Sequence, residues 1–184
     1  MEAFAFSAVT VALAEIGDKT QLLSLFLAAR FRNHTAIIAG ILLATILNHA
    51  ASAFLGEWLM NWIPAGAGRW LVGISFIAIG LWVLIPDKDD DKPSMLERYG
   101  AFVATTILFF LAEIGDKTQI ATVVLAAQYQ SLFWVTAGTT LGMLVANVPV
   151  VLLGEKLMQR LPMHYTRVAA CIVFILLGIL AIVL

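Results

Sequence analysis

The chain has 184 residues, of which 61% are hydrophobic and 12% charged, and its mean hydropathy is +0.95. This composition excludes an ordinary soluble domain and indicates a membrane protein that crosses the bilayer several times. The net charge of −1 gives no sign of a nucleic-acid partner, and the single Cys171 excludes an intrachain disulfide.

Six apolar segments follow one another along the chain, each near or above the roughly 20 residues that a helix needs to cross a bilayer. We expect no cleavable signal peptide, because the first segment has no basic residues before it and contains Glu15 and Asp18. The sequence therefore predicts an all-α membrane protein with six transmembrane helices, at residues 3–29, 34–59, 66–85, 99–127, 131–157 and 164–184.

The basic residues between these segments predict the orientation in the membrane, because Lys and Arg gather in cytoplasmic loops. Of these basic residues, only Arg69 lies on one side of the membrane, and the other eight lie on the opposite side. Both termini should therefore lie on the non-cytoplasmic side. The residues on the predicted cytoplasmic side are Arg30, Arg32, Lys88, Lys92, Arg98, Lys156, Arg160 and Arg167.

An internal repeat divides the chain into two halves. Without gaps, residues 1–86 share 28 identities with residues 99–184, at a constant offset of 98. Each half has three predicted spans, and this odd number makes the second half enter the membrane from the opposite side. The sequence thus predicts an inverted three-plus-three repeat, a design common in secondary transporters. The acidic segment 87–98 is the predicted cytoplasmic linker, and a metal-binding role for it is the weaker interpretation.

The most informative repeated element is the hexapeptide Glu-Ile-Gly-Asp-Lys-Thr, found at 15–20 and again at 113–118, each time inside an apolar span. Each charge placed in hydrocarbon costs roughly 2.5–3.5 kcal/mol on insertion scales, so ionisable residues within spans usually mark a functional site. Gly17 and Gly115 lie mid-span, where local unwinding would free backbone carbonyls as ligands.

On a continuous helix, residues three apart share a face, so Glu15 with Asp18, and Glu113 with Asp116, predict carboxylate pairs. If the two copies meet, four carboxylates converge into an oxygen-rich site suited to Mn²⁺, Ca²⁺ or Mg²⁺. We expect no resident cofactor, since such an ion would be the transported substrate. Further candidate ligands or coupling groups are Thr20, Gln21, Thr118, Gln119, Asn48, Asn147, Lys19 and Lys117.

Counting charges suggests how two substrates could compete. Two acids and one lysine in each motif give −2 for the pair when all groups are ionised. One divalent cation would neutralise this charge, and so would two protons. Carboxylates gathered in a low-dielectric cavity should take up protons when empty and lose them to a metal, as a cation/proton exchanger requires.

Other interpretations of the polar residues remain open. Lys19 follows Glu15 by four residues, a spacing that favours an intrahelical ion pair, so the motif could be purely structural. Alternatively, the lysines replace the metal when the site empties. Glu57 and Glu155, at the ends of two spans, are candidate entrance carboxylates, although solvated helix ends are the simpler interpretation. For His49 we expect a hydrogen-bonded core role.

The double motif resembles that of the UPF0016 or Gdt1 family, which includes TMEM165 and a branch of bacterial manganese exporters. The resemblance covers essentially the whole chain, and both motif copies match without departure. It implies transport of Mn²⁺ and Ca²⁺ in exchange for protons, with Glu15, Asp18, Glu113 and Asp116 as the metal site. The resemblance to the bacterial branch implies Mn²⁺ export at a bacterial inner membrane. By motif position it extends more weakly to Lys19, Thr20, Lys117 and Thr118.

We therefore expect a secondary transporter, not an enzyme, that exports Mn²⁺ and as a second candidate Ca²⁺ from the cytoplasm against protons. The nearest alternative is a Ca²⁺/H⁺ exchanger of the same fold. More distant alternatives are an intramembrane metal-dependent phosphatase, a channel and an amino-acid exporter, because the fold alone does not fix the function.

Overall fold

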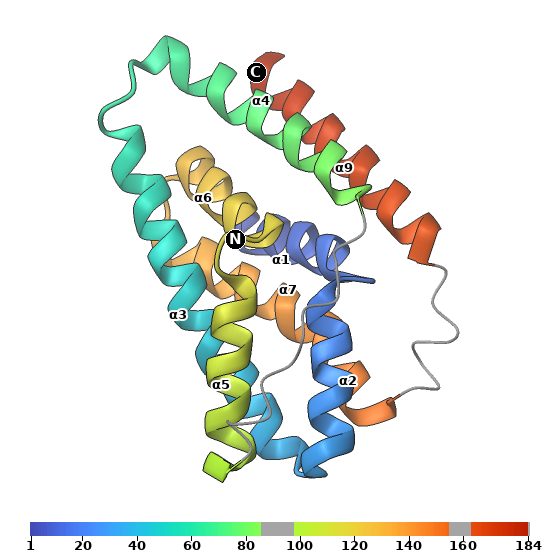
Figure 1. Cartoon of the computed structure of the whole chain (residues 1–184). Coiled ribbons are helices and arrows are strands. Elements are labelled where there is room, and N and C mark those ends of the chain that lie inside the picture. The colour runs from blue at the N-terminus through green and yellow to red at the C-terminus, as the bar shows by residue number, and fades with distance from the viewer. Residues whose placement is uncertain (86–97, 155–162, 184) are drawn as a thin grey trace.

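The fold is all-helical in the computed structural model, which describes residues 1–85, 98–154 and 163–183 (Figure 1). Almost all of the predicted linker 87–98, and the candidate entrance residue Glu155, lie outside these ranges. The helices within the ranges are α1 (Glu2–Glu15), α2 (Lys19–Phe31), α3 (His34–Met60), α4 (Ala65–Val83), α5 (Gly100–Glu113), α6 (Lys117–Tyr129), α7 (Leu132–Leu153) and α9 (Met163–Val183).

Two of the described helices, α3 and α7, are long and apolar enough to cross a membrane, with mean hydropathies of 1.8 and 1.7. Shorter apolar helices cover 67–83, 100–113 and 168–183. Many large hydrophobic side chains on these helices are exposed, among them Phe54 of α3 and Phe133 of α7, as expected for helices that face lipid. A topology of six spans in two inverted repeats stays a prediction.

The predicted first and fourth spans are not continuous helices. The segment 3–29 corresponds to α1 and α2, and 99–127 to α5 and α6, with breaks at residues 16–18 and 114–116. Both breaks contain a glycine with positive φ, 86° at Gly17 and 75° at Gly115, a conformation that costs glycine little. The unwinding predicted at these two glycines is thus present, and each hexapeptide lies where one helix ends and the next begins.

The helices of the second half begin at positions equivalent to the helix starts of the first half, at the offset of 98 residues. Glu2, Lys19, His34 and Ala65 begin helices, and so do residues 100, 117, 132 and 163. Contacts between helices repeat in the same way: α1 packs on α7 as α5 packs on α3, and α2 packs on α7 as α6 packs on α3. The two halves therefore interlock, and the two broken helix pairs face each other across the centre.

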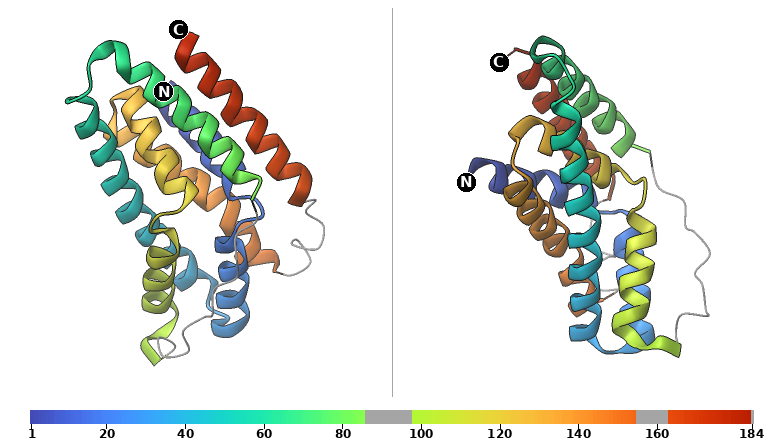
Figure 2. Two further views of the ribbon diagram at one scale, coloured as in Figure 1. Left: turned by 45° about the horizontal axis from the view of Figure 1, so that its top comes forward. Right: turned by 90° about the vertical axis from the view of Figure 1, so that its left-hand side faces the viewer.

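Helices α4 and α9 form a separate layer, side by side in both Figure 1 and Figure 2. Phe76 and Phe174 meet between them, with ring centroids 6.1 Å apart. A methyl group on Gly73 would lie 2.6 Å from the carbonyl oxygen of Gly178, so the two backbones approach closely. This pair borders the central helices α1 and α6, which contain parts of the two motifs.

Candidate functional site

Each motif begins with a tight turn that ends one helix and starts the next. Ile16 has φ −66° and ψ 115°, Gly17 has positive φ, and the amide of Asp18 donates to the carbonyl of Glu15 at 3.1 Å. These are the features of a type II β-turn, in which glycine is favoured at the third position. Ile114 has nearly the same angles, −61° and 119°, so the second motif makes the same turn.

The glutamine after each hexapeptide stabilises this turn. The side-chain oxygen of Gln21 accepts a hydrogen bond from the Gly17 amide at 2.8 Å, and that of Gln119 accepts one from the Gly115 amide at 2.6 Å. The helix break releases these amides from their helical acceptors, and the glutamine oxygens take the place of those acceptors. The predicted use of Gln21 and Gln119 as ligand oxygens therefore competes with a structural role.

The motif threonines donate hydrogen bonds to the motif glutamates. The Thr20 hydroxyl donates to Oε2 of Glu15 at 2.5 Å, and the Thr118 hydroxyl donates to Oε2 of Glu113 at 2.9 Å. Both glutamates are fully buried. The other carboxylate oxygen, Oε1, has no hydrogen-bond partner in either glutamate among the residues that the structure describes. Each glutamate thus presents one buried oxygen that a proton or a cation could satisfy.

The lysines pair across the two motifs, which corrects the intrahelical pairing with glutamate predicted from the spacing. Nζ of Lys19 lies 3.3 Å from Oδ2 of Asp116, and Nζ of Lys117 lies 3.4 Å from Oδ1 of Asp18. The prediction was wrong because the turn at residues 16–18 separates Glu15 from Lys19, so four residues no longer make one helical turn. The reciprocal pairs join the start of α2 to the start of α6.

The break also corrects the idea that Glu15 and Asp18 share a helical face. Glu15 is the last residue of α1, whereas Asp18 occupies the N-cap position of α2. The turn nevertheless keeps both carboxylates in the centre, where all four motif acids are buried. Each aspartate lies at a helix start, whose partial positive charge favours a carboxylate, whereas each glutamate lies at a helix end, whose partial negative charge disfavours one.

The two lysines differ in their surroundings. The side chain of Lys117 is 5% exposed and also lies 3.4 Å from the carbonyl oxygen of Ile85, whereas that of Lys19 is 25% exposed. Across residues 1–85, 98–154 and 163–183, no three His, Cys, Asp or Glu side chains gather closely enough to hold a metal ion. The aspartates are paired with lysines instead.

A second polar level lies next to the motifs. The Ser24 hydroxyl donates to Oδ1 of Asn147 at 2.8 Å, and Nε2 of Gln21 donates to the Ala146 carbonyl at 2.9 Å, which fastens α2 to α7. Asn48 donates to the carbonyl of Phe110 at 3.1 Å, which fastens α3 to α5. These bonds give Asn48 and Asn147 roles in helix packing, in addition to the ligand role predicted for them.

Two further residues complete the comparison with the sequence-based expectations. Both ring nitrogens of the fully buried His49 lack hydrogen-bond partners among the described residues, so the predicted hydrogen-bonded role is not present. Glu57 is partly exposed and lies three residues before the end of α3, consistent with the simpler interpretation of a helix-end carboxylate. Nothing in the sequence pointed to Ser24, because its bond to Asn147 depends on tertiary packing.

Comparison with known proteins identifies the family. The model of the divalent cation/proton antiporter GDT1 family matches residues 3–91 and 101–183. A Vibrio cholerae serotype O1 protein named "Putative manganese exporter" is 51% identical over 180 residues, covering 97% of this chain and 90% of the relative. GDT1-like protein sll0615 of Synechocystis is 23% identical, covering 98% of this chain and 97% of the relative.

A plant relative, GDT1-like protein 5 of Arabidopsis thaliana, is 26% identical and covers 97% of this chain. No solved structure matches the chain. The match to the family model spans both repeats, including both turns and both lysine–aspartate pairs. The chain therefore belongs to the GDT1 family of divalent cation/proton antiporters, which are membrane transporters and not enzymes.

Proposed function

We propose that this protein exports Mn²⁺ from the cytoplasm in exchange for protons, with Ca²⁺ as the alternative cation. Glu15, Asp18, Glu113 and Asp116 form the shared site in this proposal. Each ion would pass through a six-span bundle of two inverted repeats in a bacterial inner membrane, with both termini on the non-cytoplasmic side. Membership of the antiporter family and the manganese export named for the Vibrio relative support this choice.

One observation carries the proposal: Oε1 of Glu15 and Oε1 of Glu113 are buried without hydrogen-bond partners in the described part of the chain. Lone buried acceptors are costly, by about 1–3 kcal/mol each, and more if charged. A proton on each glutamate removes the charge, and a divalent cation bound between the motifs does the same. The two substrates therefore compete for the same oxygens, as obligatory exchange requires.

The lysine–aspartate pairs provide the second part of the mechanism. With the lysines paired to Asp18 and Asp116, the net charge of the six groups is −2 only if both glutamates are ionised. Two protons on the glutamates neutralise the metal-free centre. When Mn²⁺ enters, its charge draws the aspartates from the lysines and expels the protons, because carboxylate oxygens are suitable ligands for Mn²⁺.

A purely structural function for the motifs would need every charge to be paired. The aspartates satisfy this condition, but the glutamates do not: threonine hydroxyls occupy only one oxygen of each. A buried carboxyl held by a single hydroxyl contributes little to helix packing. The glutamates therefore favour the exchange function over the structural alternative.

Reconstitution into proteoliposomes tests the proposal. We expect Mn²⁺ flux to follow an imposed pH gradient and to reverse when the gradient is reversed, because proton binding and metal binding are mutually exclusive. Flux would be followed with a metal-sensitive dye and proton movement with an internal pH dye, with Ca²⁺ added as competitor. Mn²⁺ flux that ignores the pH gradient would contradict the exchange, and Ca²⁺ flux without Mn²⁺ flux would favour the alternative cation.

The turn glycines give a prediction with a matched control. A side chain at Gly115 meets no atom within 4 Å, and the same holds for Gly100 at the start of α5, yet both have positive φ. Alanine at either position should therefore lower stability by a similar amount, about 1–2 kcal/mol, through backbone strain alone. Only Gly115→Ala alters the site, so it should slow Mn²⁺ flux while Gly100→Ala does not. Thermal unfolding in detergent and flux in liposomes measure the two effects, and equal flux in both variants would contradict the role of the turn.

A further inference from the structure

The repeat allows one half of the molecule to be compared with the other at equivalent positions. Gly40 on α3 and Gly138 on α7 are equivalent at the offset of 98 residues. A methyl group on Gly138 would lie 2.3 Å from the Phe4 carbonyl oxygen, and one on Gly40 would lie 2.9 Å from that of Phe102, the residue equivalent to Phe4. The contact of α1 with α7 and that of α5 with α3 are thus closed in both halves.

The contacts made by α2 and α6 differ between the halves. A methyl group on Gly56 of α3 would lie 2.1 Å from the Val123 carbonyl oxygen and 3.1 Å from Cβ of Ala126 on α6. The equivalent Gly154 ends α7 with a φ of 63°, and among the described residues the nearest atom to a methyl group there is Cδ1 of Leu25 on α2, at 4.0 Å. Leu25 is equivalent to Val123, so the same contact is closed in one half and open in the other.

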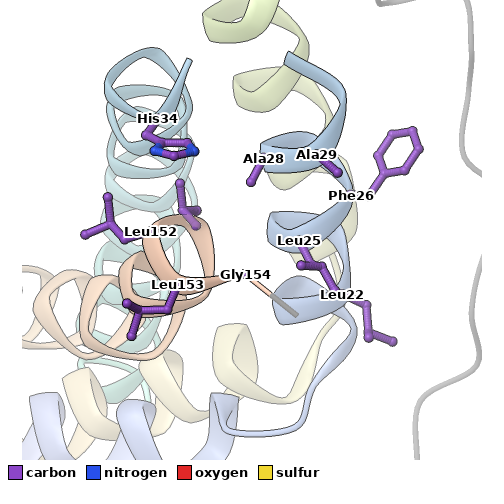
Figure 3. Close-up of a pocket in the computed structure, with 10 residues that line it drawn as sticks. Leu22, Leu25, Phe26, Ala28, Ala29, His34, Leu152, Leu153 and Gly154 are labelled. Carbon is purple, nitrogen blue, oxygen red and sulfur yellow. The ribbon is translucent and has the colours of Figure 1, made fainter. Parts of the chain in front are cut away.

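A cavity of about 710 Å³ occupies the open contact. Figure 3 shows Leu22, Leu25 and Ala28 of α2 on one side of it and Leu153 and Gly154 on the other. It lies towards the end of α2 and the start of α3, the side that has Arg30 and Arg32 and is predicted to be cytoplasmic. Nearer the motif, the bonds from Gln21 to Ala146 and from Ser24 to Asn147 still fasten α2 to α7.

We propose that these two equivalent contacts are alternating seals on opposite sides of the cation site. In the state described here, the seal of Gly56 against α6 is closed, and the seal of Gly154 against α2 is open. In the opposite state, Gly154 closes on α2 and Gly56 separates from α6. Because Gly17 and Gly115 begin the movable segments, α2 and α6 turn about these glycines while the α1–α7 and α5–α3 contacts stay fixed. The inference rests on the proposed exchange function.

Single cysteines provide the test, in a chain whose native Cys171 is replaced by alanine. Ala28, which lines the cavity, and its equivalent Ala126, which packs against Gly56, are each changed to cysteine. A charged, membrane-impermeant thiol reagent is applied to vesicles of known orientation. Without metal, we expect Ala28→Cys to react from the side of Arg30 and Ala126→Cys to be protected, with rates that differ about tenfold because labelling follows the open population.

Saturating Mn²⁺ should lower the Ala28→Cys rate and raise the Ala126→Cys rate, now from the opposite side. Ser7→Cys and Thr105→Cys, at the two fixed contacts, serve as matched controls and should stay unreactive throughout. In a Gly56→Ala background, Ala126→Cys should react even without metal, because a methyl group cannot fit against the Val123 carbonyl.

The outcomes separate this inference from the proposed function. Opposite changes in the two rates support the seals even if no proton-coupled flux is found. Proton-coupled Mn²⁺ flux with rates at positions 28 and 126 that stay constant, or that rise together, would overturn the seals while leaving the exchange function intact. Reaction of the control cysteines in step with position 126 would also overturn them, since the movement would then not be confined to α2 and α6.

Discussion

Glu15→Gln and Glu113→Gln should each reduce proton-coupled Mn²⁺ flux at least about 100-fold, since loss of even an outer-shell partner costs 10–100-fold at a metal site. Each change preserves the shape of the side chain, and the amide oxygen can still accept the hydrogen bond from Thr20 or Thr118. What disappears is the group that exchanges a proton for a cation. Flux in proteoliposomes and Mn²⁺ binding by calorimetry measure the loss.

The repeat sharpens this prediction. Because the two glutamates occupy equivalent positions and both are fully buried, their substitutions should be similarly harmful, and the double variant should be little worse than either. Glu2→Gln, an exposed position at the start of α1, is the matched control and should transport normally. Thermal stability should be retained in both site variants, since a neutral amide replaces a buried acid. Normal flux in either site variant would show that its glutamate is not part of the exchange.

Much of this arrangement could be predicted from the sequence because it depends on local chemistry or on the repeat. The offset of 98 residues predicted equivalent elements, and the helices begin at equivalent positions. Gly17 and Gly115 predicted the unwinding, because glycine in the middle of an apolar span is a weak helix former. The charge of the motif acids marked them as functional candidates, and all four are buried, whereas their convergence into one cation site stays a prediction.

The lysine partners could not be predicted, because the pairing of Lys19 with Asp116 joins residues 97 positions apart. Sequence spacing favoured Glu15, four residues away, but only for a helix without a break. The role of Gln21 was missed for a related reason: its bond to the Gly17 amide exists only once the helix has turned. The difference between Gly56 and Gly154 also lies beyond the sequence, since identical residues at equivalent positions make different contacts in one conformation.

The lysine–aspartate pairs allow a decisive test between a structural and a transporting motif. Lys117 and Asp18 are both buried, so removing one partner leaves the other charge without its ion pair. Lys117→Met and Asp18→Asn should each lower stability by about 3–5 kcal/mol, the usual cost of breaking a buried pair. The double variant should recover much of this loss, because no charge is left without its partner. Lys19→Met should cost less than Lys117→Met, since the Lys19 side chain is 25% exposed.

Stability and transport should then separate in the double variant. If the pair only held α2 against α6, restoring stability would restore flux as well. If Asp18 provides oxygens to the cation once Mn²⁺ draws it from Lys117, the double variant should fold but transport little Mn²⁺, because the remaining neutral amide is a poorer ligand than a carboxylate. Thermal unfolding and proteoliposome flux, measured on the two single variants and the double variant, decide between these outcomes. Recovery of both properties would assign the lysine–aspartate pairs to structure and leave Glu15 and Glu113 alone as the exchanging groups.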